Sequence, residues 1–288
     1  MKEKLALYYS LTKPGVTYGN AITAVAGFLL AAQGRIDLGL FASLTVGITL
    51  VIASACVINN YLDQDIDSLM TRTKTRALVA GKLPGRNAVI FSAALGIVGV
   101  WLLYAFTNPL TAYVGVFGWI VYVIFYGALS KRLSIHGTLV GSVSGAAPIV
   151  AGYTAVTNTL DTGAFILFAI LFFWQMPEFY SIAIYRRKEY AKAKVPVMTV
   201  VKGVPSTKVQ IIIYTFAFVV STFLLTGYGY AGYTYLAVMA LLGGYWLWLA
   251  FDGQDTDDDD AWAKRMFKFS LVILLAFCLM ISIDAWLP

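Results

Sequence analysis

Three oxygen-bearing side chains recur at four-residue spacing near the end of an apolar run. They are Asn59, Asp63 and Asp67, within the stretch CVINNYLDQDIDSLM. On a helix with roughly 100° per residue, these three share a face with Asn60, whereas Asp65 falls on the opposite side. Acidic side chains at the end of a membrane helix are costly to desolvate, so we expect them to face a polar cavity with neutralising partners.

Oxygen ligands of this kind favour a hard cation such as Mg²⁺. We expect Asn59, Asp63 and Asp67 to hold Mg²⁺, whose remaining ligands would be water and phosphate oxygens. A basic cluster follows directly in the sequence, made of Arg72, Lys74 and Arg76. The combination predicts a diphosphate site in which Asp65 is the least critical carboxylate. The alternative is a solvated helix end with ordinary salt bridges.

The composition places these residues in a membrane protein. Of 288 residues, 59% are hydrophobic and 12% are charged, whereas soluble domains are about 25% charged. The net charge of +6 does not indicate nucleic-acid binding, because the basic residues lie in short loops between apolar runs. Cys56 and Cys278 lie inside apolar stretches without metal-ligand spacing, so we interpret them as small core residues.

The apolar runs predict an all-α polytopic membrane protein with a single domain over residues 1–288. Each run is near the roughly 20 residues that cross a bilayer as a helix, and none alternates as a barrel strand would. The first run has no convincing cleavage site after it, so we interpret it as a span and not a removed signal peptide. We expect nine helices around a central cavity that opens toward the cytoplasmic side. The expected spans lie near 16–33, 38–62, 87–106, 110–130, 137–156, 162–184, 208–227, 230–251 and 266–286.

The distribution of basic residues predicts the orientation. With nine spans, 20 of the 21 Lys and Arg residues fall on the side of the N-terminus, and only Arg35 falls on the other side. Because Lys and Arg concentrate in cytoplasmic loops, we expect a cytoplasmic N-terminus in a bacterial cytoplasmic (inner) membrane. The long polar loops also lie on this side, which indicates that the chemistry takes place there.

Several segments carry a resemblance to a known family. The first motif and the basic cluster after it resemble the first aspartate motif of the UbiA-type intramembrane prenyltransferases. Three segments are similar to haem O synthases, a branch of that family: NNYLDQDID at 59–67, GSVSGAAP at 141–148 and WQMP at 174–177. The likeness extends from residue 12 to about residue 262, which is nearly the whole chain.

The resemblance implies an Mg-dependent reaction of farnesyl diphosphate with haem B. The farnesyl group is attached at a haem vinyl group and water supplies a hydroxyl group, giving haem O and diphosphate. Mg²⁺ and basic side chains would neutralise the departing diphosphate, and aromatic faces are available to stabilise the allylic cation. The expected partners are farnesyl diphosphate, haem B and the lipid bilayer, and a haem-handling protein is a further candidate.

The segment WQMPEFYSIAIYRRKEYAKAKVPVMTVVKG is the expected second half of the site. Aligned with the first motif, it has Tyr185 at the position of Asp63 and Glu189 at the position of Asp67. Many UbiA-type proteins have two aspartates in this second motif, so only one carboxylate is retained here. Glu189 is therefore the candidate for a catalytic second metal ligand, and the alternative is a salt bridge at a helix end.

Glu178 stands where haem O synthases usually have a histidine, so histidine contact with haem is not expected at this position. Glu178 and Glu189 are eleven residues apart and would share a face on an unbroken helix. Pro177 fits the start of a helical segment after a break. We predict that Glu178 is catalytic, and the alternative is a buried structural pair.

Further polar residues on the same side are candidates for substrate binding. The only histidine, His136, cannot supply two haem ligands by itself. The basic residues among these candidates could instead be orientation signals or contacts to anionic lipids. The acidic run 257–260 is expected to be a solvated loop, because like charges in sequence repel. The full set of substrate-binding candidates is Asn59, Asn60, Arg72, Lys74, Arg76, Lys131, Arg132, His136, Tyr185, Lys188 and Lys202.

Three other functions remain open at this point. The first is a UbiA-type transferase that acts on an aromatic or quinone-precursor acceptor in place of haem. A membrane transporter also uses intramembrane acids, although here they gather at one face and no charged series crosses the membrane. A haem-handling scaffold without catalytic activity is the third.

Overall fold

The computed structural model describes residues 2–287 of the chain, and this range contains helices and no strand. Nine of the helical segments within residues 2–287 are long and apolar enough to cross a membrane, which confirms the predicted all-α fold and number of spans. The elements in chain order are α1 (Lys2–Leu11), α2 (Pro14–Ala32), α3 (Leu38–Leu62), α4 (Gln64–Leu69), α5 (Gly85–Phe106), α6 (Pro109–Ile120), the π-helix η1 (Val121–Ser130), α7 (Lys131–Leu133), α8 (Gly137–Thr157), α9 (Thr162–Tyr185), α10 (Arg187–Lys192), α11 (Met198–Val201), α12 (Gly203–Gly227), α13 (Tyr233–Asp252), the 3-10 turn η2 (Gly253–Asp255), α14 (Asp259–Ile283) and the 3-10 turn η3 (Asp284–Trp286).

Most predicted spans coincide closely with the observed helices, and 38–62 is identical to α3. The largest difference is at α14, which begins at Asp259 and not near residue 266. Asp258 caps this helix, because its carboxylate accepts a hydrogen bond of 2.9 Å from the Ala261 amide. Acidic residues in the first turn also suit the positive end of the helix dipole, so the charged segment is helical.

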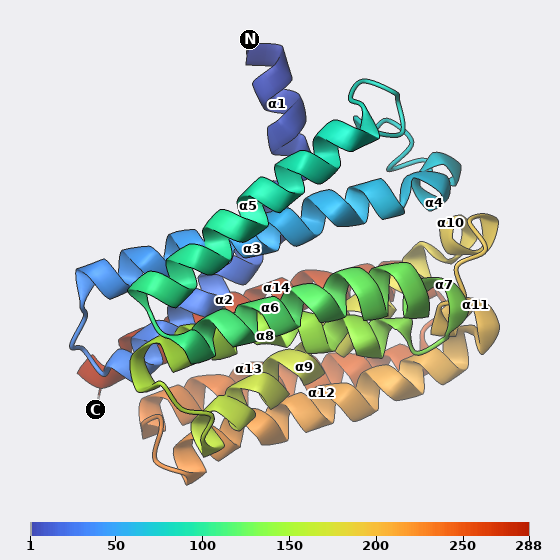
Figure 1. Ribbon diagram of the computed structural model, residues 1–288. Helices are drawn as coiled ribbons and strands as arrows, with labels where there is room; N and C mark the ends of the chain where they lie inside the picture. The colour runs from blue at the N-terminus through green and yellow to red at the C-terminus, as the bar shows by residue number, and fades with distance from the viewer. Residues whose placement is uncertain (1, 288) are drawn as a thin grey trace.

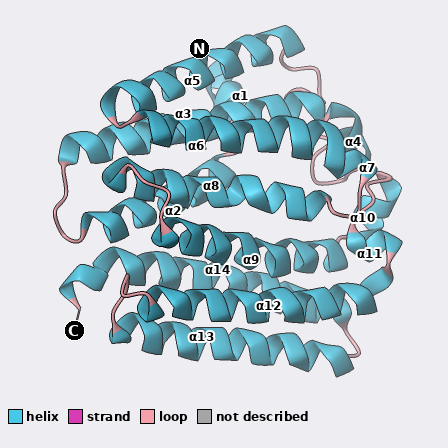
Figure 2. Cartoon of the chain, turned by 60° about the horizontal axis from the view of Figure 1, so that its bottom comes forward, coloured by secondary structure: helices cyan, strands magenta, loops and turns pink. Residues whose placement is uncertain are grey.

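The long helices pack side by side, and short helices collect at one end of the bundle (Figures 1 and 2). α3 packs on α5, α2 packs on α8, and α9 contacts α8, α12 and α14. The short helices α4, α7, α10 and α11 lie at the right-hand end of the bundle in Figure 1. We call this the motif end, because Asp63 joins α3 to α4 there.

Glycines allow α2 and α8 to approach closely. A methyl group at Gly152 of α8 would overlap the backbone carbonyl oxygen of Ala24, and one at Gly27 of α2 would overlap that of Ile149. Small residues at such crossings let helix backbones pack closely, which drives helix association within a bilayer. The crossing fixes α8 against the helix that begins next to the site described below.

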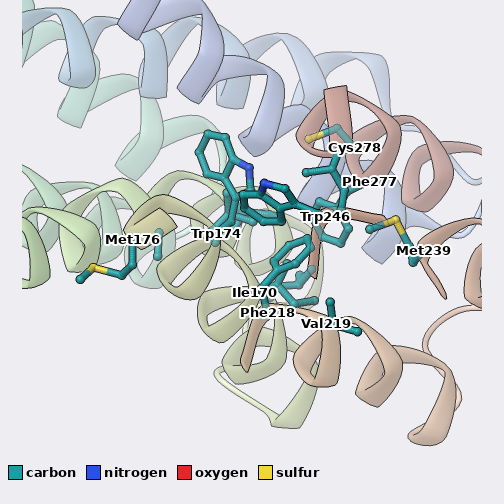
Figure 3. Close-up of a cluster of buried hydrophobic side chains, with 14 of the residues drawn as sticks. Ile170, Trp174, Met176, Phe218, Val219, Met239, Trp246, Phe277 and Cys278 are labelled. Atoms are coloured by element: carbon teal, nitrogen blue, oxygen red, sulfur yellow. The ribbon is translucent and has the colours of Figure 1, made fainter. Parts of the chain in front are cut away.

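A cluster of buried hydrophobic side chains joins α9, α12, α13 and α14 (Figure 3). The Trp174 indole donates a hydrogen bond of 2.8 Å to the Ser270 carbonyl oxygen of α14. Phe218 of α12 meets the Trp246 ring of α13 edge to face, with ring centroids 5.4 Å apart. The Trp174 hydrogen bond fixes the second half of α9 against α14, and the ring contact joins α12 to α13 in the same cluster.

The predicted helix break before Pro177 is wrong, because Pro177 lies inside the continuous helix α9. Proline is tolerated in membrane helices where neighbouring groups satisfy the freed backbone carbonyl. The helix ends instead at Tyr185, and α10 begins separately at Arg187. The expected unbroken helix that carries both Glu178 and Glu189 is therefore also wrong.

A pair of glycine substitutions tests the α2–α8 crossing. We expect Gly152→Ala to destabilise the protein by about 1–3 kcal/mol, because its methyl group meets rigid backbone. Gly244→Ala in α13 has no heavy atom within 4 Å and should be neutral or stabilising by up to ~1 kcal/mol. Thermal unfolding of both purified variants in detergent measures the difference. Equal stability of the two variants would contradict the close crossing.

Candidate active site

The first motif lies where α3 passes into α4. The Asp63 amide donates to the Asn59 carbonyl at 3.0 Å and the Asp67 amide donates to the Asp63 carbonyl at 2.8 Å, so the helical spacing continues across the junction. Asn59, Asp63 and Asp67 are 2%, 1% and 3% exposed. The Asp65 side chain is 66% exposed. This burial pattern is the one that the four-residue spacing predicts.

Each buried oxygen group of the motif has a basic partner. Lys131 Nζ lies 2.5 Å from Asp63 Oδ2. Arg76 Nη1 lies 2.5 Å from Asp67 Oδ2. Lys13 donates a hydrogen bond to Asn59 Oδ1. A buried carboxylate requires such counter-charges, because its desolvation is not otherwise compensated.

Asp65 forms a separate surface ion pair with Arg132, whose guanidinium donates to its two carboxylate oxygens at 2.6 and 2.8 Å. Hydrogen bonding from Arg132 lowers the pKa of Asp65 to about 2. The same guanidinium donates to the Leu62 carbonyl and reaches within 3.9 Å of Asp63 Oδ1. Arg132 therefore holds the α3–α4 junction, whereas exposed Asp65 contributes little to stability.

The π-helix η1 places two tyrosines next to the motif. The rings of Tyr122 and Tyr126 lie 5.7 Å apart, and the Lys131 ammonium lies 6.0 Å from the Tyr126 ring centroid. Both tyrosines keep part of their surface accessible. A methyl group at Gly127 would lie 3.4 Å from Asn59 Nδ2, so this glycine brings η1 against the motif. π-Helical segments are rare and are found frequently at functional sites.

The second polar segment packs on the first through a small apolar cluster. Ile66 and Met70 contact Ala193 and Val195, which joins α4 to the loop after α10. Nearby, burial raises the pKa of the Tyr190 phenol and Tyr126 raises it further, while the charges of basic residues lower it. Those basic residues are Lys131, Arg72 and Arg186. The charges of basic residues from three separate segments therefore act on Tyr190 at the motif end.

Glu189 does not join Asp63 and Asp67 in this structure. Its carboxylate lies 3.0 Å from Arg186 Nη1, one helical turn away. Among residues 2–287, no group of three or more His, Cys, Asp or Glu side chains is arranged to hold a metal ion. A four-ligand site that includes Glu189 is therefore not preformed.

Glu178 points between α8 and α14. Trp174, one turn earlier, donates to Ser270 of α14, and Gln175 donates to the Ser142 carbonyl of α8 at 3.3 Å. Glu178 lies between these directions on the helix and keeps part of its surface accessible. Its carboxylate has no hydrogen bond or ion pair of 4.0 Å or less to any residue in the described range. The expected alternative of a buried structural pair is therefore absent among these residues.

The remaining candidates lie around this core. Asn60 is buried and donates a hydrogen bond of 2.7 Å to the Leu11 carbonyl. Tyr185 packs against Phe267 with the Arg186 guanidinium over its ring. Five candidates are exposed and form no ion pair with any residue of the described range. They are Arg72, Lys74, His136, Lys188 and Lys202.

The acidic run 257–260 is not only a solvated loop. Asp259 lies 2.6 Å from the ammonium of Lys208, which is almost completely buried, and Asp260 pairs with Arg187. These contacts join the start of α14 to α12 and to the second polar segment. Asp257 and Asp258 are exposed as expected. The expectation was wrong for Asp259 and Asp260, because basic residues from distant parts of the chain neutralise them.

Lys13 is a site residue that sequence reasoning missed. Burial lowers its pKa to about 8, and its backbone is left-handed with φ of 50°. A non-glycine residue in this conformation is sterically unfavourable, and such strain concentrates at functional sites. Its position directly before Pro14 and the first span was a sequence signal, but it was counted only as an orientation charge.

The buried oxygen atoms of the motif are suitable ligands for a hard cation. Asn59, Asp63 and Asp67 offer an amide and two carboxylates, which are the ligands that Mg²⁺ prefers. Asp63 Oδ1 is buried and has no hydrogen-bond partner among residues 2–287. A buried oxygen without a partner is costly unless a ligand satisfies it. The arrangement can therefore bind a cation and, through the surrounding basic groups, an anion such as diphosphate.

Comparison with known proteins gives matches over nearly the whole chain. Residues 20–272 match the model of the UbiA prenyltransferase family. The chain is 49% identical over 281 residues to the protoheme IX farnesyltransferase of Enterobacter sp. (strain 638), covering 98% of this chain and 95% of that protein. It is 50% identical over 277 residues to that of Serratia proteamaculans (strain 568), covering 96% and 94%.

Solved structures share the fold at lower sequence identity. The chain is similar to a digeranylgeranylglyceryl phosphate synthase structure, with a TM-score of 0.82, 20% identity and coverage of 98% of this chain and 99% of that one. It is also similar to a UbiA homolog from Archaeoglobus fulgidus bound to GPP and Mg²⁺, with a TM-score of 0.72, 15% identity and coverage of 96% and 99%. These matches establish the helical arrangement.

Two Asp→Asn variants test the buried pairing in the ligand-free protein. Asp63→Asn leaves the partly buried Lys131 without its counterion, so we expect a loss of roughly 2–4 kcal/mol of stability. Asp65→Asn removes only an exposed pair and should cost less than about 1 kcal/mol. Thermal unfolding in detergent gives the ranking. A larger loss for Asp65→Asn would contradict the assigned pairing.

Proposed function

Because the chain belongs to the UbiA prenyltransferase family, we propose that it transfers a farnesyl group from farnesyl diphosphate to a vinyl group of haem B. Water adds in the same reaction, and the products are haem O and diphosphate. The observation that carries this proposal is the buried set of Asn59, Asp63 and Asp67, surrounded by basic groups at the end of a membrane helix. The names of relatives that match nearly full length support the choice of haem and farnesyl as substrates.

In this proposal, Asn59, Asp63 and Asp67 hold Mg²⁺. When bound, Mg²⁺ supplies positive charge that stabilises the departing diphosphate. Glu189 would act as a ligand for a second ion only after it releases Arg186. Asp65 takes no part, because its side chain is exposed and paired with Arg132.

Basic side chains at the motif end bind and orient the diphosphate. Lys131 and Arg76 are already within 2.5 Å of the motif carboxylates, and Arg72 and Arg186 lie near Tyr190. Lys is a flexible point charge and Arg offers a planar fork of donors, so together they can follow the leaving group as its charge grows. The farnesyl chain would extend away from these charges among the helices.

Tyr122 and Tyr126 are placed to stabilise the allylic cation. Their rings lie close together beside the motif, and a cation over an aromatic face is attracted to its negative quadrupole. A tyrosine pair also excludes water from the carbon that loses diphosphate. This protection directs the cation toward the vinyl group before any water can capture it.

Glu178 is the proposed base for the addition of water. Bond formation between the farnesyl carbon and the vinyl group leaves a cationic carbon next to the haem ring. The water oxygen bonds to this carbon, and the Glu178 carboxylate accepts the proton that the water loses. An unpaired carboxylate within α9 suits this role, because no basic side chain of the described residues occupies it.

The nine apolar helices found within residues 2–287 make the chain an integral, multi-pass membrane protein. We further propose that it lies in a bacterial cytoplasmic membrane with its N-terminus and motif end in the cytoplasm. The support is the concentration of 20 of the 21 Lys and Arg residues on that side. Water-soluble farnesyl diphosphate headgroups would then reach the site directly.

Product analysis tests the proposed reaction. Purified protein supplied with farnesyl diphosphate, haem B and Mg²⁺ should form haem O, identified by mass, and EDTA should stop it. We expect Asp63→Ala and Asp67→Ala to lower turnover by about 10²–10³-fold, because each removes charge stabilisation, and Asp65→Ala by less than about tenfold. Prenylation of 4-hydroxybenzoate in place of haem would contradict the proposed acceptor. Full activity of both motif variants would contradict the proposed chemistry.

A Glu178→Gln variant tests the proposed base. We expect hydroxylated product to fall by about 10²-fold, the usual contribution of a positioned base. Part of the prenylated product should then be lighter than haem O by the mass of one water molecule. The reason is that the cation loses a proton instead of gaining a hydroxyl group. Glu3→Gln in the exposed helix α1 is the matched control and should behave as wild type. An unchanged product ratio in Glu178→Gln would exclude this role.

A further inference from the structure

The ion pairs of the motif have a consequence for how substrates bind, which rests on the proposed function. We propose that Lys131 and Arg76 are displaceable counterions. They neutralise Asp63 and Asp67 before substrates arrive and move to diphosphate oxygens when Mg²⁺ takes the carboxylates. The site then binds metal and diphosphate strongly only when both are present.

The Lys131 ammonium contacts a carboxylate oxygen of Asp63 to which the metal ion would bind. Lys131 Nζ contacts Asp63 Oδ2 at 2.5 Å, while Asp63 Oδ1 has no hydrogen-bond partner in the part of the chain that the structure describes. Arg76 covers Asp67 Oδ2 in the same way, and Lys13 covers Asn59 Oδ1. An oxygen of each proposed ligand is therefore occupied by a basic group of the protein itself.

The charges oppose binding of either substrate alone. Lys131, Arg76 and Lys13 already outweigh the two carboxylates, so a divalent cation by itself would enter a positively charged site. A diphosphate by itself could draw Lys131 and Arg76 to its oxygens only by leaving the buried carboxylates of Asp63 and Asp67 without counterions. Coulomb interactions at a few ångströms in a partly buried site are strong enough to decide between these states. When Mg²⁺ and diphosphate enter together, their charges largely cancel and every basic group retains an acidic partner.

The displaced Lys131 ammonium can move to a new partner. Lys131 carries its charge on a flexible four-carbon chain and is 18% exposed, so its ammonium can move without a change in the backbone. The charges of this ammonium, of Arg72 and of Arg186 all act on Tyr190. A diphosphate bound among these three cations would replace Asp63 as the partner of Lys131.

Binding measurements on the purified full chain test this coupling. Mn²⁺ affinity is measured by the spin-resonance signal of the free ion, with and without inorganic pyrophosphate, for wild type and Lys131→Met. In wild type we expect pyrophosphate to tighten Mn²⁺ binding by about tenfold or more, within the usual range of coupling between two sites. In Lys131→Met, Mn²⁺ alone should bind several-fold tighter than in wild type, and the enhancement by pyrophosphate should shrink.

Two further variants serve as controls. Lys208→Met removes an ion-paired lysine outside the site that is more deeply buried than Lys131, and this variant should keep the wild-type coupling. Lys131→Arg retains the positive charge, so it should restore weak Mn²⁺ binding in the absence of pyrophosphate. Association of Mn²⁺ with pyrophosphate in solution is the same for all variants and cancels in the comparison.

The outcomes separate this inference from the proposed function. If Mn²⁺ and pyrophosphate bind to all variants with the same coupling, the counterion role of Lys131 is overturned. The proposed function is then unaffected. Weaker binding of Mn²⁺ alone to Lys131→Met than to wild type would also overturn it. No binding of either probe to any variant would overturn both proposals.

Discussion

Two carboxylates buried at the end of a membrane helix are the constraint on which the site depends. Asp63 and Asp67 are almost completely inaccessible, and a buried charge is tolerated only with partners. The partners come from separate parts of the chain, because Lys131 follows the π-helix and Arg76 lies in the loop before α5. Much of the arrangement at the motif end serves to bring these basic groups to the acids.

The helices position the site through close packing. Gly127 lets the π-helix approach Asn59, and the apolar contacts of Ile66 and Met70 hold α4 on the second polar segment. The acidic start of α14 anchors the same segment through Arg187 and the base of α12 through Lys208. Hydrophobic contacts among α9, α12, α13 and α14 (Figure 3) complete the apolar bundle that supports the polar groups at its end.

The spans and the main motif were predictable from the sequence, and the partners were not. Continuous apolar runs define helices of membrane length, and the spacing of Asn59, Asp63 and Asp67 predicts a shared buried face. A local sequence pattern does not show which distant segments come together in the fold. The roles of Lys13 and of the acidic run were missed for this reason. The break between α9 and α10 was misplaced because Pro177 is accommodated within a membrane helix. The π-helix likewise depends on tertiary packing, since its sequence is as apolar as its neighbours.

The most direct test is the position of a metal ion in an experimental structure of the protein with Mn²⁺ and inorganic pyrophosphate. The account predicts anomalous signal from Mn²⁺ at about 2.0–2.3 Å from carboxylate oxygens of Asp63 and Asp67. Lys131 should then contact a phosphate oxygen and no longer Asp63. Metal bound elsewhere, or an intact Lys131–Asp63 pair beside bound pyrophosphate, would contradict the central claim.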